Sequence, residues 1–246
     1  AEPDLILVGS TMTYWYPGYF LALSLSRERF PKIPSVLGGL YPRLCPDHAR
    51  RFSGADFIFT GADLRSFFDL LENVSRSSAE KIAAFDLRPA WDLLSSRNSL
   101  AIQTSRGCPY SCSYCAAGMI EPIPEQRQPA AVVDEIEDYV TGFGTTDLAF
   151  YDNALLYRDR DHIDPILIGV MERNLHCRFH TPNGLHAGLL TRKTAVLMQE
   201  TGFINPRLSL ETSDPVKQQK TGGKVSSADL ARALDFLESA GYRRAE

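Results

Sequence analysis

The chain has 246 residues, of which 44% are hydrophobic, and its 26 basic and 30 acidic side chains leave a net charge of -4. This composition excludes a disordered chain, leaves room for one large or two modest domains, and gives no positive field that favours nucleic acid as a partner. Apolar runs such as 5–8 and 166–170 are far too short to cross a bilayer, so we expect no membrane partner.

In the first quarter of the chain, short apolar stretches that predict strands alternate with stretches of helical periodicity. The expected strands are 5–8, 35–37 and 56–60, and the expected helices are 19–29 and 63–74. The first residue, Ala1, is not an initiator methionine and a strand follows it at once, so we expect the chain to begin inside a domain. This alternation predicts a parallel sheet that binds its ligands beyond the carboxyl ends of its strands.

A second series of strands and helices follows an irregular stretch at 75–98, which we interpret as the connection between two domains. The expected strands of this second series are 100–104, 147–151, 176–180 and 207–210, and its expected helices are 129–142, 162–173, 191–201 and 226–240. The last helix begins with a serine of the type that caps helices.

Polar side chains stand where two strands of the second series end. Asp152 and Asn153 follow the strand at 147–151, and Glu211 and Ser213 follow the strand at 207–210. Enzymes built from parallel strands and helices keep their chemistry at these carboxyl ends. Local turns, caps or salt bridges are the alternative explanation for the same residues.

Three of the five cysteines, Cys108, Cys112 and Cys115, lie within eight residues. Three thiolates are one too few to close a tetrahedral zinc site, whereas a [4Fe–4S] cluster held by three cysteines leaves one iron free to bind a ligand. Zinc, or thiols without a shared role, are the alternatives. The isolated Cys45 and Cys177 are interpreted as buried small hydrophobes. An odd number of cysteines with three crowded together fits metal binding in a reducing, cytoplasmic compartment better than a disulfide framework.

The pattern Cys-x-x-x-Cys-x-x-Cys, with Tyr114 just before the last cysteine, resembles the signature of the radical S-adenosylmethionine (SAM) superfamily. The segments 90–94 and 104–109 resemble the entry to the barrel in members that carry an N-terminal cobalamin (B12)-binding domain, and residues 1–60 resemble part of that domain. The resemblance implies an α/β chain, truncated at both ends. Its expected parts are a partial Rossmann-like cobalamin-binding domain at 1–74, a linker at 75–98, and an incomplete (β/α)6 partial TIM barrel at 99–246 holding the first four β/α units.

The resemblance also implies roles for individual residues, while no catalytic residue is assigned. It implies cluster ligation by Cys108, Cys112 and Cys115, SAM contacts from Tyr114, Asp152, Asn153, Glu211 and Ser213, and cobalamin contacts from Ser10, Gly38 and Gly39. Two departures from the family pattern stand out. Met12 replaces the leucine of a Ser-x-Leu element, and the pair at 152–153 replaces a Gly-Gly-Glu element.

The activity implied is the reductive cleavage of SAM by a [4Fe–4S] enzyme, with methyl transfer through cobalamin as the expected outcome. The expected partners are a small-molecule or natural-product substrate and a reductant such as flavodoxin or ferredoxin. One alternative is a methylthiotransferase-like modifier of RNA or protein, which carries further cluster cysteines upstream, whereas residues 1–107 contain only Cys45. The other alternative is a non-catalytic iron–sulfur protein for electron transfer or sensing.

Overall fold

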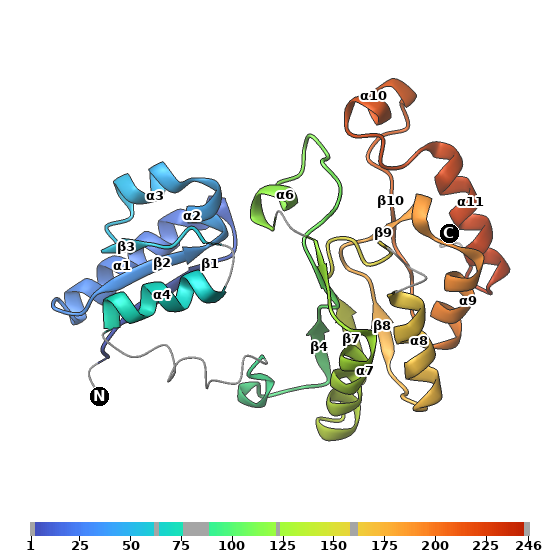
Figure 1. The fold of residues 1–246 in the computed structure, drawn as a ribbon, viewed down its shortest axis with the longest axis horizontal. Coiled ribbons are helices and arrows are strands. Elements are labelled where there is room, and N and C mark those ends of the chain that lie inside the picture. The colour runs from blue at the N-terminus through green and yellow to red at the C-terminus, as the bar shows by residue number, and fades with distance from the viewer. Residues whose placement is uncertain (1–2, 62–63, 76–88, 122–123, 158–161, 244–246) are drawn as a thin grey trace. The chain divides into compact units, whose positions relative to one another are not determined.

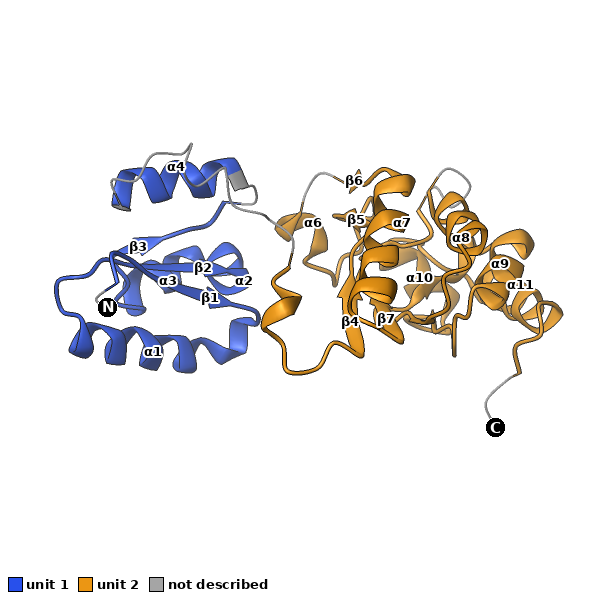
Figure 2. Ribbon diagram, turned by 90° about the horizontal axis from the view of Figure 1, so that it is seen from below, with its two compact units in different colours: residues 1–88 blue, residues 89–246 orange. Residues whose placement is uncertain are grey.

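The computed structural model describes residues 3–61, 64–75, 89–121, 124–157 and 162–243. The chain divides into two compact units, residues 1–88 and 89–246 (Figure 2). Of the expected connection at 75–98, residues 76–88 lie outside the described ranges, and the stretch from Pro89 onward is part of the second unit. Across the described ranges, every helix lacks the length or the apolar character that crossing a membrane requires.

The first unit is built on a parallel sheet with the strand order β1–β2–β3. Its strands are β1 (Ile6–Ser10), β2 (Ser35–Gly39) and β3 (Phe57–Ile58), and its helices are α1 (Tyr16–Arg29), α2 (Leu40–Leu44), α3 (Pro46–Phe52) and α4 (Leu64–Ser75). Figure 2 shows the three strands between α1 and α4. A small core of Leu23, Leu37, Tyr41 and Ala49 holds α1, α2 and α3 to the sheet.

The expected strands and helices of the first unit are confirmed, while α2 and α3 were not anticipated. Both are short, and α3 begins with Pro46 in its first turn, where proline is tolerated because its missing N–H has no helical partner. A proline within such a short stretch hides the helical periodicity from sequence analysis.

The second unit contains a parallel sheet with the strand order β4–β7–β8 (Figure 1). Its strands are β4 (Ser99–Ile102), β7 (Asp147–Phe150) and β8 (Arg178–His180), joined by α7 (Pro129–Glu137) with a π-helical last turn at Asp138–Gly142, and by α8 (Ile163–Glu172). Alternate strand residues such as Leu100, Leu148 and Phe179 are buried in one apolar core with the helices. The predicted alternation of strands and helices is confirmed here.

The expected fourth strand, at 207–210, forms β10 (Leu208–Ser209), which pairs with β9 (Leu185–His186) and not with β8. A single parallel bridge between Phe179 and Phe203 lies beside this pair. The chain turns between β8 and β9, where Gly184 has a φ of +75° and its N–H bonds the Thr181 carbonyl at 3.1 Å. The third expected strand, at 176–180, is thus followed by a turn and by the short strand β9, and it is β9 that pairs with β10.

The remaining helices close the chain. The expected helices form α9 (Arg192–Glu200) and α11 (Ser227–Ser239), and α10 (Pro215–Lys220) is an additional helix. Ser226 caps α11 as predicted, in a capping box with Asp229. Three small elements surround the cysteines and were also not anticipated. They are β5 (Ser105–Arg106), β6 (Glu125–Gln126) and α6 (Ala117–Ile120).

Candidate functional site

The three cysteines lie on a loop that starts from a short hairpin beyond the carboxyl end of β4. Ser105 of β5 pairs antiparallel with Gln126 of β6. Gly107, whose φ is +71°, donates its N–H to the Glu121 carboxylate at 2.8 Å. These two contacts hold the backbone in place immediately before Cys108.

All three cysteines are free thiols. Cys108 and Cys112 are half-buried and Cys115 is exposed. The Cys115 N–H donates to the Cys112 carbonyl at 3.0 Å, and the Ala117 N–H reaches the Cys115 sulfur at 3.5 Å. Backbone hydrogen bonds to sulfur are among the contacts that tune iron–sulfur clusters. The donor set, its exposure and this hydrogen bond fit an iron–sulfur cluster.

The three cysteine sulfurs do not converge on a single ion position. Within the residues that the structure describes, no three His, Cys, Asp or Glu side chains gather around one possible ion position. In a cube, each cysteine binds a different iron, so its three ligands need not converge on one point.

A glycine-containing loop after α10 packs directly on Cys112. Gly222 has a φ of +118°, and a β-carbon there would lie 3.3 Å from the Cys112 Cα and 3.7 Å from its sulfur. The neighbouring Gly223 also has a positive φ but nothing within 4 Å. Only glycine lets the backbone approach the cysteine loop this closely without strain. The glycine pair was the one signal in the sequence that could have revealed this contact.

Two of the residues predicted to contact SAM lie together beside Cys112. Burial raises the pKa of the Tyr114 hydroxyl, and the nearby Cys112 thiol and Glu211 carboxylate raise it further. Glu211 follows β10, so the fold brings this strand end to the cysteine loop. Ser213 and Asn153 are exposed, and for these two residues the SAM contact stays a prediction.

Asp152 lies in a different environment from the one expected for a SAM contact. It is 2% exposed, and its carboxylate accepts hydrogen bonds from the Thr104 N–H and from the Thr104 and Ser105 hydroxyls. The chain's own donors therefore occupy this carboxylate, and the geometry favours a structural role for it. Asn183 donates to the carbonyls of Tyr151 and Asp152, at 3.1 and 3.2 Å, and ties the end of β7 to the turn after β8.

A buried histidine that sequence analysis did not single out lies against the cysteine loop. The rings of His186 and Tyr110 lie tilted against each other, with an interplanar angle of 39° and their centroids 4.8 Å apart. The Gly188 N–H donates to His186 Nδ1 at 3.1 Å, so the neutral ring carries its proton on Nε2. Burial, followed by the nearby Lys224 ammonium, lowers the pKa of His186 to about 4. No sequence pattern marks this histidine, because its burial depends on the pairing of β9 with β10.

In the first unit, the residues predicted to contact cobalamin meet at the carboxyl ends of β1 and β2. The Ser10 hydroxyl donates to the Gly38 carbonyl at 2.6 Å and accepts the Tyr41 N–H at 3.0 Å. Gly39 follows with a φ of +90°, a conformation that favours glycine. Ser10 thereby locks the turn that carries the glycine pair. Their contact with cobalamin stays a prediction.

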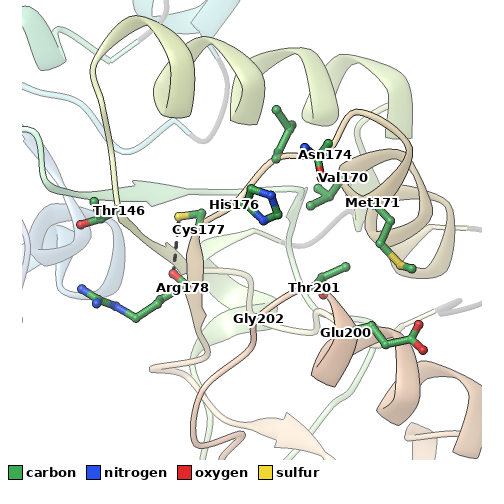
Figure 3. A pocket seen from close by; sticks show the side chains of 11 residues that line it. Thr146, Val170, Met171, Asn174, His176, Cys177, Arg178, Glu200, Thr201 and Gly202 are labelled. Carbon is green, nitrogen blue, oxygen red and sulfur yellow. Dashed lines mark hydrogen bonds between the residues drawn. The ribbon is translucent and has the colours of Figure 1, made fainter.

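A cavity of about 530 Å³ lies where β7 and β8 begin, at the opposite ends of these strands from the cysteine loop (Figure 3). Cys177 lines it, and burial raises the pKa of this thiol to about 12. Such a thiol stays protonated and unreactive. Cys177 was expected to be buried, and the structure shows it half-buried.

Comparison with known protein families matches residues 102–245 to the radical SAM superfamily, so the chain belongs to this superfamily. Membership assigns the two cofactors that define the class, a [4Fe–4S] cluster and SAM. One curated relative is the hopanoid C-2 methylase of Rhodopseudomonas palustris, 24% identical over 74% of this chain. Another is the anaerobic magnesium-protoporphyrin IX monomethyl ester cyclase of Cereibacter sphaeroides, 23% identical over 87% of this chain. The chain spans 37% of the length of each.

Two solved structures share the fold over 98% of the chain. One is the radical SAM methyltransferase TsrM from Kitasatospora setae with tryptophan substrate and a SAM analogue bound, with a TM-score of 0.78 and 16% identity over 56% of that protein. The other is the cobalamin-dependent SAM radical enzyme OxsB with aqua-cobalamin bound, with a TM-score of 0.76 and 16% identity over 40% of that protein. These likenesses show that the chain has the mixed α/β fold of this class.

Proposed function

We propose that this chain is part of a cobalamin-dependent radical SAM methyltransferase. The observation that carries the proposal is the loop of three free cysteines, with Gly222 packed on Cys112 and with Tyr114 and Glu211 beside it. A loop with three ligands on a rigid hairpin suits a cluster that keeps one iron for SAM. When bound, the reduced cluster supplies the electron that cleaves a bond at the SAM sulfonium.

The protein's own contribution is to hold and orient these groups. Cys108, Cys112 and Cys115 would ligate the cluster. Glu211 and Tyr114 are suited to bind polar groups of SAM, because a carboxylate and a phenol offer an acceptor and a donor beside the open iron. Asn153, which follows β7, and Ser213, which follows β10, complete the proposed SAM contacts.

We extend the proposal to the fold of each unit. The parallel order β1–β2–β3 supports a partial Rossmann-like cobalamin-binding domain within residues 1–74, with Ser10, Gly38 and Gly39 at its ligand-binding edge. The parallel pairs β4–β7, β7–β8 and β9–β10 support the first four β/α units of a (β/α)6 partial barrel from residue 99 onward. Parallel sheets bind ligands at the carboxyl ends of their strands, which is where both sets of residues lie.

The proposed substrate is a small molecule, and the proposed electron source is a flavodoxin- or ferredoxin-type reductant. The relatives support methylation, since one is named a hopanoid methylase and TsrM is a methyltransferase solved with tryptophan. The cyclase relative covers a larger share of this chain, and it supports a second candidate, a cobalamin-assisted cyclisation.

Anaerobic reconstitution of the longest expressible form of the protein tests the proposal. After reduction and addition of hydroxocobalamin and SAM, we expect S-adenosylhomocysteine, because reduced cobalamin takes up the methyl group that SAM loses. Titration with hydroxocobalamin alone should change the visible spectrum. A Cys112→Ala variant should lose the roughly 400 nm absorption of the cluster, because a thiolate ligand is gone.

Each result separates the candidates. Formation of 5′-deoxyadenosine without S-adenosylhomocysteine supports the cyclisation candidate over methyl transfer. If neither product forms, the result favours the alternative of a non-catalytic iron–sulfur protein. If hydroxocobalamin does not bind, the cobalamin assignment is wrong.

A further inference from the structure

We propose that a buried chain of hydrogen bonds from His162 through Thr104 and Asp152 to Ser105 positions the cysteine loop, and thereby determines how the cluster is presented to SAM. These are positioning residues and not cluster ligands. The inference rests on the proposed function, because it assigns a task to residues beneath the proposed cluster.

The four side chains are polar yet withdrawn from solvent. Their exposed fractions are 0% for Thr104, 2% for Asp152, 2% for His162 and 6% for Ser105. A buried polar group is costly unless it is hydrogen-bonded, so a cluster of four at one place needs a reason. An apolar set of the same shape would pack here without that cost.

The hydrogen bonds converge on the Asp152 carboxylate. Asp152 Oδ1 accepts the Ser105 hydroxyl at 2.6 Å and the Thr104 hydroxyl at 2.7 Å, and both carboxylate oxygens lie near the Thr104 N–H, at 3.1 and 3.2 Å. Since the Thr104 hydroxyl gives its only proton to Asp152, it accepts one from His162 Nε2, which lies 2.9 Å away. His162 is therefore a donor to Thr104, and Asp152 is the acceptor that Thr104 and Ser105 share.

This hydrogen-bond network joins three segments that are far apart in the sequence. Asp152 follows β7, His162 immediately precedes α8, and Thr104 and Ser105 connect β4 to the hairpin. Cys108 comes only three residues after Ser105. A shift of Ser105 relative to β7 is transmitted to Cys108 through this short, hydrogen-bonded connection, since Gly107 is also held by Glu121.

Asp152 is the common acceptor for both hydroxyls, which explains why an acidic residue follows β7. A residue with a single acceptor could not take three hydrogen bonds at once. Burial lowers the pKa of His162, and the donor role requires only that Nε2 carries a proton.

The second unit contains a matched control for these contacts. Thr194 donates its hydroxyl to the buried Asp164 carboxylate at 2.8 Å, between α9 and α8. Both residues are at most 1% exposed. This pair has the same chemistry as Thr104 and Asp152 but does not touch the cysteine loop. Thr194→Val removes this hydrogen bond and the contact between the Thr194 and Thr191 hydroxyls, 2.7 Å apart. It therefore reports the cost of losing buried hydroxyl contacts away from the cysteine loop.

The experiment compares Ser105→Ala, Thr104→Val and Thr194→Val in the reconstituted protein. Three readouts are iron per chain, the electron paramagnetic resonance spectrum of the reduced cluster with and without SAM, and the Kd for SAM. We expect Ser105→Ala and Thr104→Val to bind SAM about tenfold more weakly and to alter the SAM-dependent spectrum, as loss of one buried hydrogen bond allows. Thr194→Val should match the wild type in all three readouts, although it unfolds more easily.

A conservative pair tests the part played by His162. His162→Gln keeps an N–H donor that can reach Thr104, and His162→Leu removes it. We expect the glutamine variant to retain the wild-type Kd for SAM and the leucine variant to lose affinity.

The outcome distinguishes this inference from the proposed function. If Ser105→Ala and Thr104→Val keep the wild-type spectrum and Kd, the network only stabilises the core and the inference is wrong. If His162→Gln and His162→Leu bind SAM with the same Kd, His162 is not one of the positioning residues. A wild-type protein that takes up no cluster, or whose cluster ignores SAM, overturns the proposed function instead.

Discussion

Ser10 and Gly39 approach so closely that a β-carbon on Gly39 would lie 2.2 Å from the Ser10 carbonyl oxygen. No side chain fits there, and the positive φ of Gly39 adds strain for any other residue. We predict that Gly39→Ala destabilises the first unit by at least about 2 kcal/mol and abolishes hydroxocobalamin binding. Urea unfolding and visible titration measure the two effects.

Gly9→Ala is the matched control for this change. Gly9 lies in the same strand as Ser10, and a β-carbon there would meet nothing within 4 Å. The alanine should leave stability within about 0.5 kcal/mol of the wild type or raise it slightly. Similar losses in both variants would contradict the role given to Gly39.

The two glycines after α10 allow a test of the contact with Cys112. Both have positive φ, so alanine strains the backbone at either position, but only Gly222 has Cys112 atoms within reach of a β-carbon. We predict that Gly222→Ala lowers the iron content after reconstitution, while Gly223→Ala loses stability and keeps its iron. An equal iron content in the two variants would show that the contact between Gly222 and Cys112 does not affect cluster binding.

His186 should make stability depend on pH. Its pKa in the folded chain, lowered to about 4 by burial and then by Lys224, lies below the ordinary value of 6.5. The unfolded chain thus takes up the proton first, and the stabilisation is complete above pH 6.5 and is lost as the pH falls towards 4. We predict a loss of about 2 kcal/mol from this residue between pH 7 and pH 5.

His186→Asn isolates that contribution, because the amide oxygen can still accept the Gly188 N–H and does not titrate. Urea unfolding of the cluster-free chain should show a shallower pH dependence for this variant than for the wild type. The other buried histidine, His162, is present in both proteins and cancels in the comparison. Parallel pH curves would show that the charges facing His186, from Lys224 and Asp229, compensate its protonation.

Tyr114 and Glu211 should act as a pair in SAM binding. Their side chains lie together beside Cys112, although they come from the cysteine loop and from the end of β10. We predict that Tyr114→Phe and Glu211→Gln each weaken SAM binding, with a coupling of about 1 kcal/mol in a double-mutant cycle. Additive effects would mean that the two residues contact separate parts of SAM or none. Equilibrium dialysis with the reconstituted protein provides the four Kd values.

The cysteine spacing and the alternation of strands and helices could be predicted from the sequence because both are local patterns. Cys108, Cys112 and Cys115 lie within one loop, so their spacing alone points to a cluster. The helix that Ser226 caps was predicted on the same local basis. Glu211 was placed near the site because parallel strands bring their carboxyl ends to one edge.

Contacts between distant segments were decided only by the tertiary structure. A predicted SAM contact, Asp152, turned out to be buried beneath Thr104 and Ser105, because β4 and β7 pair in a register that brings their ends together. Gly222 reached Cys112, and His186 reached Tyr110, across more than 70 residues of chain. The sequence by itself determined which chemical groups are available and in which local conformation. Which groups contact one another depends on strand pairing and packing. These interactions form only when the whole unit folds.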